Sequence, residues 1–227
     1  TDFYALGHTW RAFVYGVLFV DGRHTYRLSG RMGDSPLLLL QTHNGVEGEA
    51  HMQCTGNYDF DDFRLGENRS FEVVLSASPQ PGNWVKIDPD VDYQYVLIRR
   101  ALPDWYADPG EVRVERIDHR PDNFWDDDEF DEAVMAARIR RATAFLRCLG
   151  IKWNIGFYDL YLAKAEGRKN MLTLIAGGTA GPAGSPSSNY AFGLFDLQDD
   201  EALIVDMPQA PDGAYWSFQL GDVWSRS

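Results

Sequence analysis

The run Arg11-Ala12-Phe13-Val14-Tyr15-Gly16-Val17-Leu18-Phe19-Val20, followed at once by Asp21-Gly22, decides the fold of the first part of this chain. The run is apolar and rich in β-branched and aromatic residues, which favour a strand. Asp-Gly is a strong signal for a tight turn between two strands. The next segment, 25–29 (TYRLS), alternates, so that Tyr26 and Arg27 face opposite sides of a strand. The pattern predicts two strands joined by a tight turn.

Four further strands are predicted before residue 120, at 37–42, 71–76, 93–100 and 111–117. The run 37–42 (LLLLQT) fits a helix or a strand by pattern alone, but its length and its Gly, Pro and Asn neighbours favour a buried strand. The polar stretch 44–68 is predicted to be a long loop, and 79–83 a turn. Six or so short strands at regular spacing are typical of a sandwich or jelly roll.

The character of the sequence changes at residue 121. An acidic segment, 126–129, precedes a helical pattern whose predicted apolar seam is Met135, Ile139, Ala142, Leu146 and Leu149, with Arg138, Arg140 and Arg147 off the seam. Gly150 is predicted to end this helix, and a second helix is expected over 151–165 with Ile155, Tyr158, Leu162 and Ala165 on one side. Residues 177–189 (GGTAGPAGSPSSN) indicate a mobile loop or linker. Strand signals resume at 191–195, 202–207 and 215–220.

An internal repeat links the two ends of the chain. The segments Asp21 to Gln41 and Asp199 to Gln219 each open on an acidic turn, contain a strand and a loop with Gly and Asp, and end in an apolar strand. The repeat predicts that a second sandwich begins near residue 191, and that about 60 to 80 further residues would follow Ser227 to complete it, by analogy with the first half.

The expected fold is therefore mainly β with a helical insert: two jelly-roll-like β-sandwiches joined by α-helices, the second incomplete. The expected organisation is a first sandwich over 1–120, a helical connector over 121–176, a Gly/Pro/Ser loop over 177–190 and the start of a second sandwich over 191–227.

Several motifs resemble a bacterial family catalogued as domain of unknown function 1214, often found with its relative 1254. The motifs are 21–30 (DGRHTYRLSG), 81–84 (PGNW), 112–117 (VRVERI), 200–205 (DEALIV), and 215–220 (YWSFQL) with Trp224. The resemblance implies two jelly-roll-like sandwiches flanking a helical linker. It also implies a longer protein, with a helical region before this chain and further strands after it, and it carries over no catalytic residue.

Composition and charge exclude some classes of partner. The formal net charge of −13 argues against nucleic acid, polyanionic substrates and anionic membrane surfaces. No stretch approaches the roughly 20 apolar residues that span a bilayer. Cys54 and Cys148 form neither a metal motif nor a disulfide framework, so free thiols are expected. The chain starts without Met, and a processed N-terminus is expected, so the protein is predicted to be soluble, cytoplasmic or exported. The oligomeric state stays open.

A metal site is one hypothesis. His43, His51 and Cys54 surround one polar loop, and imidazole and thiolate are good ligands for a divalent metal such as zinc. The alternative is a polar loop with a buried Cys54. Asp59, Asp61 and Asp62 offer oxygen ligands for calcium, although the spacing is not that of an EF-hand and an ordinary acidic turn is the alternative.

Other catalytic signals are weak, and the catalytic residues, if any, stay unknown. His119 follows Asp118, but neighbours on a strand face opposite sides. Ser185 lies in the Gly/Pro/Ser stretch, a poor place for a nucleophile that needs a fixed geometry. The chain has no G-x-S-x-G elbow and no phosphate-binding loop.

The aromatic residues suggest ligand binding. The candidates for stacking on a small molecule or a glycan are Trp84, Trp105, Tyr215, Trp216 and Trp224, with Trp153 as a further large aromatic. Packing in a core or between domains is the alternative. The leading hypothesis is a protein that binds a small molecule or glycan in an aromatic cleft between the sandwiches. The alternatives are a metal-dependent enzyme that uses the His/Cys loop, and a structural or assembly protein of the double jelly-roll type.

Overall fold

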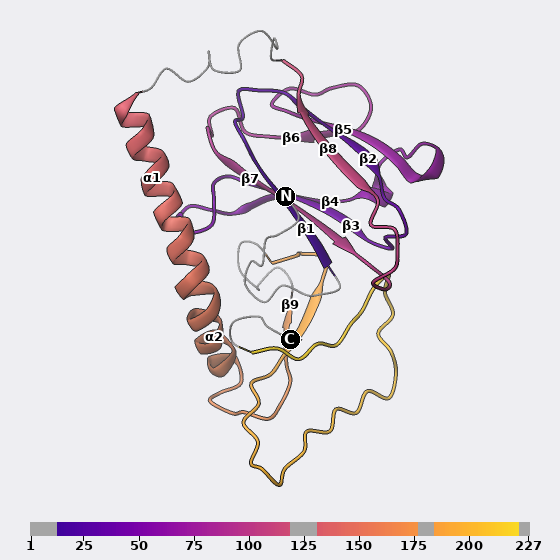
Figure 1. The fold of residues 1–227 in the computed structure, drawn as a ribbon, viewed down its shortest axis with the longest axis vertical. Coiled ribbons are helices and arrows are strands. Elements are labelled where there is room, and N and C mark those ends of the chain that lie inside the picture. Colours follow the sequence, from indigo (N-terminus) through magenta and orange to yellow (C-terminus); the bar gives the residue numbers. More distant parts are fainter. Residues whose placement is uncertain (1–12, 119–130, 177–183, 223–227) are drawn as a thin grey trace. The chain divides into compact units, whose positions relative to one another are not determined.

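The computed structural model describes residues 13–118, 131–176 and 184–222, and these residues form two compact units. The described part of unit 1 lies between residues 13 and 147, and that of unit 2 between residues 148 and 222. The two units follow one another at Arg147 and Cys148, inside the helical region, whereas the sequence pattern changes at residue 121. Figure 1 shows the elements of both units.

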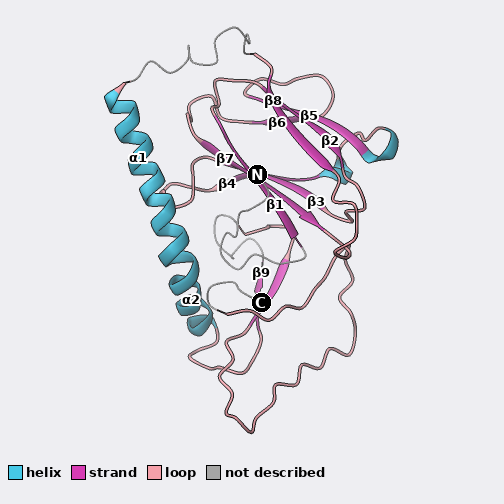
Figure 2. Ribbon diagram, viewed as in Figure 1, coloured by secondary structure: helices cyan, strands magenta, loops and turns pink. Residues whose placement is uncertain are grey.

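Unit 1 contains two four-stranded sheets (Figure 2). Sheet A has the order β1-β7-β3-β4, and all its neighbours are antiparallel. Sheet B has the order β6-β5-β2-β8, and only β5 and β6 run parallel. The strands of sheet A are β1 (Phe13–Val20), β7 (Gln94–Ala101), β3 (Leu38–His43) and β4 (Cys54–Asp59), and those of sheet B are β6 (Trp84–Lys86), β5 (Ser70–Ser76), β2 (Tyr26–Arg31) and β8 (Glu111–Arg116).

One hydrophobic core joins the two sheets. Leu40 and Ile98 of sheet A and Leu28 and Leu75 of sheet B belong to the same buried cluster, with Phe60 from the 3-10 turn η1 (Phe60–Asp62). These residues alternate with residues of the opposite face along each strand, as a half-buried strand requires. The mainly β fold with a helical insert is thus confirmed, while the finer jelly-roll connectivity stays a prediction.

The six predicted strands of the first half all occur, and two more are present. β4 lies in the stretch 44–68 that was expected to be a loop, so that expectation is wrong. Its sequence, CTGNYD, is polar and contains Gly56, and it forms a strand because it pairs along β3. A second 3-10 turn, η2 (Glu67–Arg69), and the short β6 complete the unit. The pairing of β4 with β3 and of β6 with β5 overrides a weak local preference for strand structure in these two segments.

The helix begins where an acidic side chain caps it. The Asp131 carboxylate accepts hydrogen bonds from the backbone N–H groups of Ala133 (2.7 Å) and Val134 (3.4 Å), at the start of α1 (Glu132–Arg147). The predicted end at Gly150 is wrong, because a π-helical segment (Cys148–Gly156) continues directly into α2 (Phe157–Lys164). α2 ends at Lys164, and the turn that follows contains Gly167, whose φ of 77° favours glycine and whose N–H bonds to the Leu162 carbonyl (2.8 Å).

The predicted apolar seam of α1 is also wrong. Met135, Ile139 and Leu146 are 37%, 59% and 66% exposed. The side chain that α1 buries is Phe145, whose ring lies edge-on to Phe19 of β1 with ring centroids 6.2 Å apart. Within unit 1, α1 therefore packs against β1 along a different face from the one that the repeat of apolar residues indicates.

Unit 2 has little regular β structure. β9 (Thr173–Ala176) and β10 (Asn189–Phe192) form a two-stranded antiparallel sheet that packs with α2 through Tyr161 and Ile175. The predicted strands at 202–207 and 215–220 are not formed, and Ile204 is largely exposed. The second copy of the predicted repeat therefore has no counterpart of β2 and β3 in the described residues. Among those residues, no helix is both long and apolar enough to cross a membrane.

Candidate functional site

A groove of about 360 Å³ lies on the outer face of sheet B. It follows β5, whose alternate residues Ser70, Glu72 and Val74 face away from the core. Two loop segments form its walls, one before η2 and one before β6. The lining residues are Arg64, Gly66, Ser70, Phe71, Glu72, Val74, Pro81, Gly82 and Asn83. The volume is at the lower end of the range for small-molecule sites.

Asn83 ties the walls of the groove together. Its side-chain amide donates to the backbone carbonyls of Arg64 (2.9 Å) and Glu72 (2.9 Å), and its carbonyl oxygen accepts from the Arg64 N–H (2.8 Å). All the hydrogen bonds go to backbone, so they fix the loop and not merely a side chain. The turn before Asn83 contains Gly82, whose φ of 84° favours glycine. The motif 81–84 thus has a structural role, since it builds the groove.

The polar side chains of the groove include a cation, an anion and a hydroxyl. Arg64 is exposed, and its guanidinium forms no ion pair in the part of the chain that the structure describes. Glu72 forms a loose ion pair with Arg27, with 3.6 Å between the Arg27 Nε and the Glu72 Oε2, and its carboxylate is largely exposed. Ser70 adds a hydroxyl, and a Cβ at Gly66 would lie only 2.7 Å from the Ser70 Oγ. Glycine at residue 66 therefore keeps the space beside this hydroxyl free.

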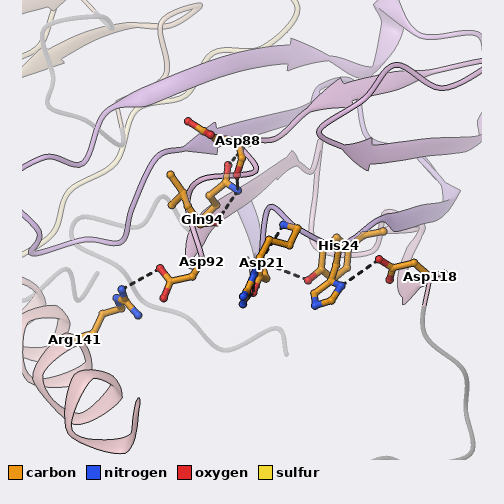
Figure 3. A network of polar contacts seen from close by, with 10 residues as sticks. Asp21, His24, Asp88, Asp92, Gln94, Asp118 and Arg141 are labelled. Atoms are coloured by element: carbon orange, nitrogen blue, oxygen red, sulfur yellow. Dashed lines mark hydrogen bonds and ion pairs between the residues drawn. The ribbon is translucent and has the colours of Figure 1, made fainter. Parts of the chain in front are cut away.

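A second polar cluster lies at the turn between β1 and β2 (Figure 3). Gly22 donates its N–H to the Val91 carbonyl (3.0 Å), and a Cβ at Gly22 would lie 1.6 Å from the Asp88 carbonyl oxygen, so only glycine fits. The buried Gln94 holds the opposing loop, because its amide bonds to the Asp88 N–H and to the carbonyls of Asp88 and Val91. The Asp-Gly turn was predicted, but its partner loop was not.

His24 and Asp118 meet in this cluster. The Nδ1 atom of His24 lies 3.1 Å from the Asp118 Oδ2, which also accepts from the Thr25 N–H (3.1 Å), while Oδ1 accepts from Arg116 Nε (3.1 Å). Burial of the Asp118 carboxylate raises its pKa, but the hydrogen bonds from Arg116, His24 and Thr25 outweigh burial and hold the pKa below its usual value. A carboxylate that fixes an imidazole is an arrangement suited to proton transfer.

The third part of the cluster fixes α1. The Arg141 Nε donates to the Glu49 Oε1 (3.0 Å), and its Nη2 donates to the Asp92 Oδ1 (3.3 Å). The guanidinium also lies over the Tyr93 ring, 4.7 Å from its centroid. Figure 3 shows Arg141 on the helix pointing at Asp92. The arrangement joins α1 to two loops of unit 1, and its role is structural.

The structure does not bring His43, His51 and Cys54 together as metal ligands. His43 is buried, with its Nδ1 2.9 Å from the Tyr95 carbonyl, and His51 is exposed beside Glu49 (3.7 Å). Cys54 donates to the Gly56 carbonyl (3.4 Å), and burial raises the pKa of its thiol, which disfavours the thiolate that binds metal. The described residues hold no group of three His, Cys, Asp or Glu side chains suited to a metal ion.

The other predicted polar sites have local structural partners. Asp59 caps η1 by accepting from the Asp61 N–H (3.0 Å), and Asp61 pairs with Arg69 (3.2 Å), so these carboxylates do not converge on a cation. Ser185 is buried, and its hydroxyl lies 3.2 Å from that of Ser187. His119 lies outside the described residues.

The described members of the predicted aromatic set have different surroundings within their own units. Trp84 lies on β6, and its indole N–H bonds to the Ser76 carbonyl (3.2 Å). Trp105 and its neighbour Tyr106 are 75% and 99% exposed, on the loop between β7 and β8. In unit 2, Tyr215 is half-buried and Trp216 is exposed, Trp153 stacks on Phe157 with centroids 4.6 Å apart, and Trp224 lies outside the described residues.

Sequence reasoning missed the groove and the His24–Asp118 pair. Arg64 and Asn83 are nineteen positions apart, and His24 and Asp118 ninety-four. The register of β2 and β8 places Tyr26 opposite Arg116, and its continuation by two residues places His24 opposite Asp118. The sequence pattern predicts the strands β2 and β8, but it does not indicate that these two strands pair with each other.

No protein-family model matches this chain, and no curated protein matches it. The chain is similar to an uncharacterized protein of known crystal structure from Burkholderia cenocepacia, with a TM-score of 0.65 and 28% identity over 80% of this chain and 48% of that one. The chain therefore spans about half the length of that protein. The VPA0106 protein from Vibrio parahaemolyticus gives a TM-score of 0.35 and 10% identity over 45% of this chain and 30% of that one.

Proposed function

We propose that this chain binds a small, neutral, hydroxyl-rich molecule of the saccharide class in the groove on sheet B. The observation that carries the proposal is the mixed lining of the groove. Arg64 supplies donors, Glu72 an acceptor and Ser70 a hydroxyl, next to the apolar surfaces of Val74 and Pro81. A sugar presents hydroxyls that both donate and accept, together with apolar C–H faces, and such a lining matches both.

Charge favours a neutral ligand over an anion. The groove is lined by one cation, Arg64, and one anion, Glu72, so its two charges compensate each other. The chain as a whole has a formal net charge of −13, which repels polyanions at long range. Strong phosphate or carboxylate sites instead use several converging donors. A ligand with many weak dipoles and no net charge fits this balance best.

The groove is held in shape before a ligand arrives. The hydrogen bonds of Asn83 fix the loop of Arg64 relative to β5, and the parallel pair of β5 and β6 fixes the other wall. Walls that are already ordered spare a ligand the entropy cost of ordering them. The expected aromatic cleft is replaced in this proposal by a groove without an exposed aromatic face, since Trp84 does not line it.

The test is saturation-transfer NMR and titration calorimetry with a panel of neutral mono- and disaccharides. The unchanged chain is expected to bind members of the panel, and Arg64→Ala and Glu72→Gln are each expected to weaken binding about tenfold or more, because each removes a hydrogen bond to a charged group. Arg140→Ala, at an exposed position of α1, is the matched control and is expected to bind normally.

The variant Trp105→Ala distinguishes binding in the groove from binding at the exposed Trp105–Tyr106 pair. If Trp105→Ala abolishes saccharide binding while Arg64→Ala does not, the ligand binds at the exposed Trp105–Tyr106 pair and the groove is the wrong site. If no neutral saccharide binds the unchanged chain at millimolar concentration, the ligand class is wrong.

A further inference from the structure

Helix α1 carries an apolar stripe that faces solvent. Four residues at intervals of four, three and four lie on one face of this helix: Met135, Ile139, Ala142 and Leu146. All four side chains are exposed, whereas the buried Phe145 packs on β1 from another face. Alternate intervals of four and three residues are the spacing of the a and d positions at which two helices pair. The stripe is therefore a helix-pairing seam that the described residues of the chain leave uncovered.

The two ends of α1 carry opposite charges next to this stripe. Glu132 is one heptad before Ile139 and so lies on the same face, and Arg147 follows Leu146 directly. Both charged side chains are exposed, and neither forms an ion pair with another described residue. The stripe therefore runs from an acidic end to a basic end. Such a pattern is complementary to its own reverse, as a two-fold contact between identical helices requires.

We propose that two copies of this chain associate by antiparallel packing of α1 on α1 along the stripe. In the register that pairs the apolar residues, Ile139 lies opposite Ala142 of the second copy, and Met135 lies opposite Leu146 of the second copy. A two-fold axis then passes between residues 140 and 141. The two central layers each join a large side chain to a small one, so the helices can approach closely, and the outer layers cover Met135 and Leu146.

The charges select the antiparallel direction. In this register Arg147 of each copy lies beside Glu132 of the other, at both ends of the contact. A parallel dimer would instead place Glu132 beside Glu132 and Arg147 beside Arg147, and like charges on neighbouring helix positions are destabilising. The helix dipoles favour the same direction, because the positive N-terminus of one helix lies near the negative C-terminus of the other.

The neighbouring arginines of α1 leave room for this contact. Arg141 is held on another face of the helix by Glu49 and Asp92. Arg140 follows Ile139 by one residue and lies about 100° around the helix from it, away from the centre of the stripe. The contact extends over three turns of helix, or about 16 Å. A contact of this length covers little apolar surface, so a weak dimer that dissociates at micromolar concentration is expected.

The test is sedimentation velocity of the full chain from low micromolar to near-millimolar concentration, where a dimer that dissociates on dilution is expected. Ile139→Glu places a charge at the centre of the stripe and is expected to abolish the dimer, because burying an unpaired carboxylate costs more than so short a contact gains. Val134→Glu is the matched control, since Val134 is an exposed apolar residue of α1 outside the stripe, and the dimer is expected to persist. Circular dichroism should show the same helix content in both variants.

Two charge variants test the direction of the pairing. Glu132→Arg and Arg147→Glu each place like charges together at both ends of the antiparallel contact, so each variant alone is expected to dimerise about three- to tenfold more weakly. Mixed in equal amounts, the two variants restore both opposite-charge pairs, and a mixed dimer is expected. In a parallel dimer, each single variant would exchange one pair of like charges for another, and the affinity would not fall. A chain that stays monomeric at every concentration overturns the proposal and leaves the stripe to a different partner. Association that Ile139→Glu leaves unchanged, or that neither charge variant weakens, overturns it too.

Discussion

Sheets A and B of unit 1 share one core. On the faces that point away from this core, sheet A buries its polar side chains, whereas sheet B exposes them to solvent. On sheet A, Gln41 and His43 are completely buried and Arg99 is 8% exposed. On sheet B, the side chains of Arg27 and Glu72 are 40% and 62% exposed. A buried polar group must find its partner inside the protein, whereas water satisfies an exposed one. The same kinds of residue should therefore matter greatly on sheet A and little on sheet B.

The largest effect is expected for Gln41→Leu. The Gln41 carbonyl oxygen accepts a hydrogen bond from the buried Arg99 guanidinium, and leucine fills the same space without an acceptor. We expect a loss of about 2–3 kcal/mol in the free energy of unfolding, because a buried charge loses a hydrogen bond. Urea denaturation measures it. Glu72→Gln on sheet B is the matched change and should cost far less, and equal losses at the two positions would remove the contrast between the sheets.

Arg141→Ala tests how firmly α1 is attached near sheet A. The Arg141 side chain is mostly buried between Glu49, Asp92 and the Tyr93 ring. We expect a loss of about 1–2 kcal/mol in unfolding free energy, from a partly desolvated ion pair and a cation–π contact. Amide hydrogen exchange in the C-terminal half of α1 should become faster. Arg140→Ala, one residue earlier and exposed, should change neither quantity, and a similar response from both would show that helix propensity and not the contact is responsible.

Asp118→Asn tests a carboxylate at the end of sheet B, where the Asp118 side chain, 33% exposed, joins β8 to the turn before β2. The pKa of Asp118 is depressed in the folded chain, so the ionised carboxylate stabilises the fold above its unfolded pKa of about 4, and this stabilisation is lost as the pH falls through the lower folded value. With solvent screening of a site one-third exposed, we expect a deficit of about 0.5–1 kcal/mol at pH 7.

The measurement is urea denaturation of Asp118→Asn and the unchanged chain between pH 7 and pH 3. Their difference in unfolding free energy should shrink steadily below about pH 4. Asp62→Asn, at an exposed position, is the control and should show no such trend. A difference that stays constant down to pH 3 would mean that the carboxylate acts by shape and not by charge.

Sequence patterns predict the strands of unit 1 better than its site. Apolar or alternating runs are present in β1, β2, β5, β7 and β8. These runs predict the strands correctly because every second residue of a strand faces the shared core. β4 has no such run, since it is an edge strand of sheet A with a polar sequence. The helix was predicted, but its buried face was not. Phe145 packs on Phe19, and Arg141 pairs with Glu49 and Asp92, and these three partners lie far from the helix in the sequence.

The groove could not be predicted from the sequence, because it also depends on contacts between distant segments. Its walls come from residues 64–66 and 81–83, and the parallel pairing of β5 with β6 brings them together. Local patterns do not indicate which strands pair in parallel, so Asn83 could be expected to form a corner but not to hold the Arg64 loop. The candidate ligands His43, His51 and Cys54 are close in sequence, yet strand alternation and burial give each a different environment.

The smallest effect is expected for Arg27→Gln on the outer face of sheet B. The Arg27 guanidinium lies 3.6 Å from both Glu72 and Glu115, and all three side chains are at least 40% exposed. Exposed ion pairs of this kind gain little, since water competes for each charge, so we expect a change within about 0.5 kcal/mol in unfolding free energy. Molar salt should reduce even this difference. Arg99→Gln makes the same replacement on sheet A and should cost several times more. Urea denaturation of both variants compares the two faces with one chemical change. If Arg27→Gln costs as much as Arg99→Gln, solvent does not satisfy the charges of sheet B, and the distinction between the two faces fails.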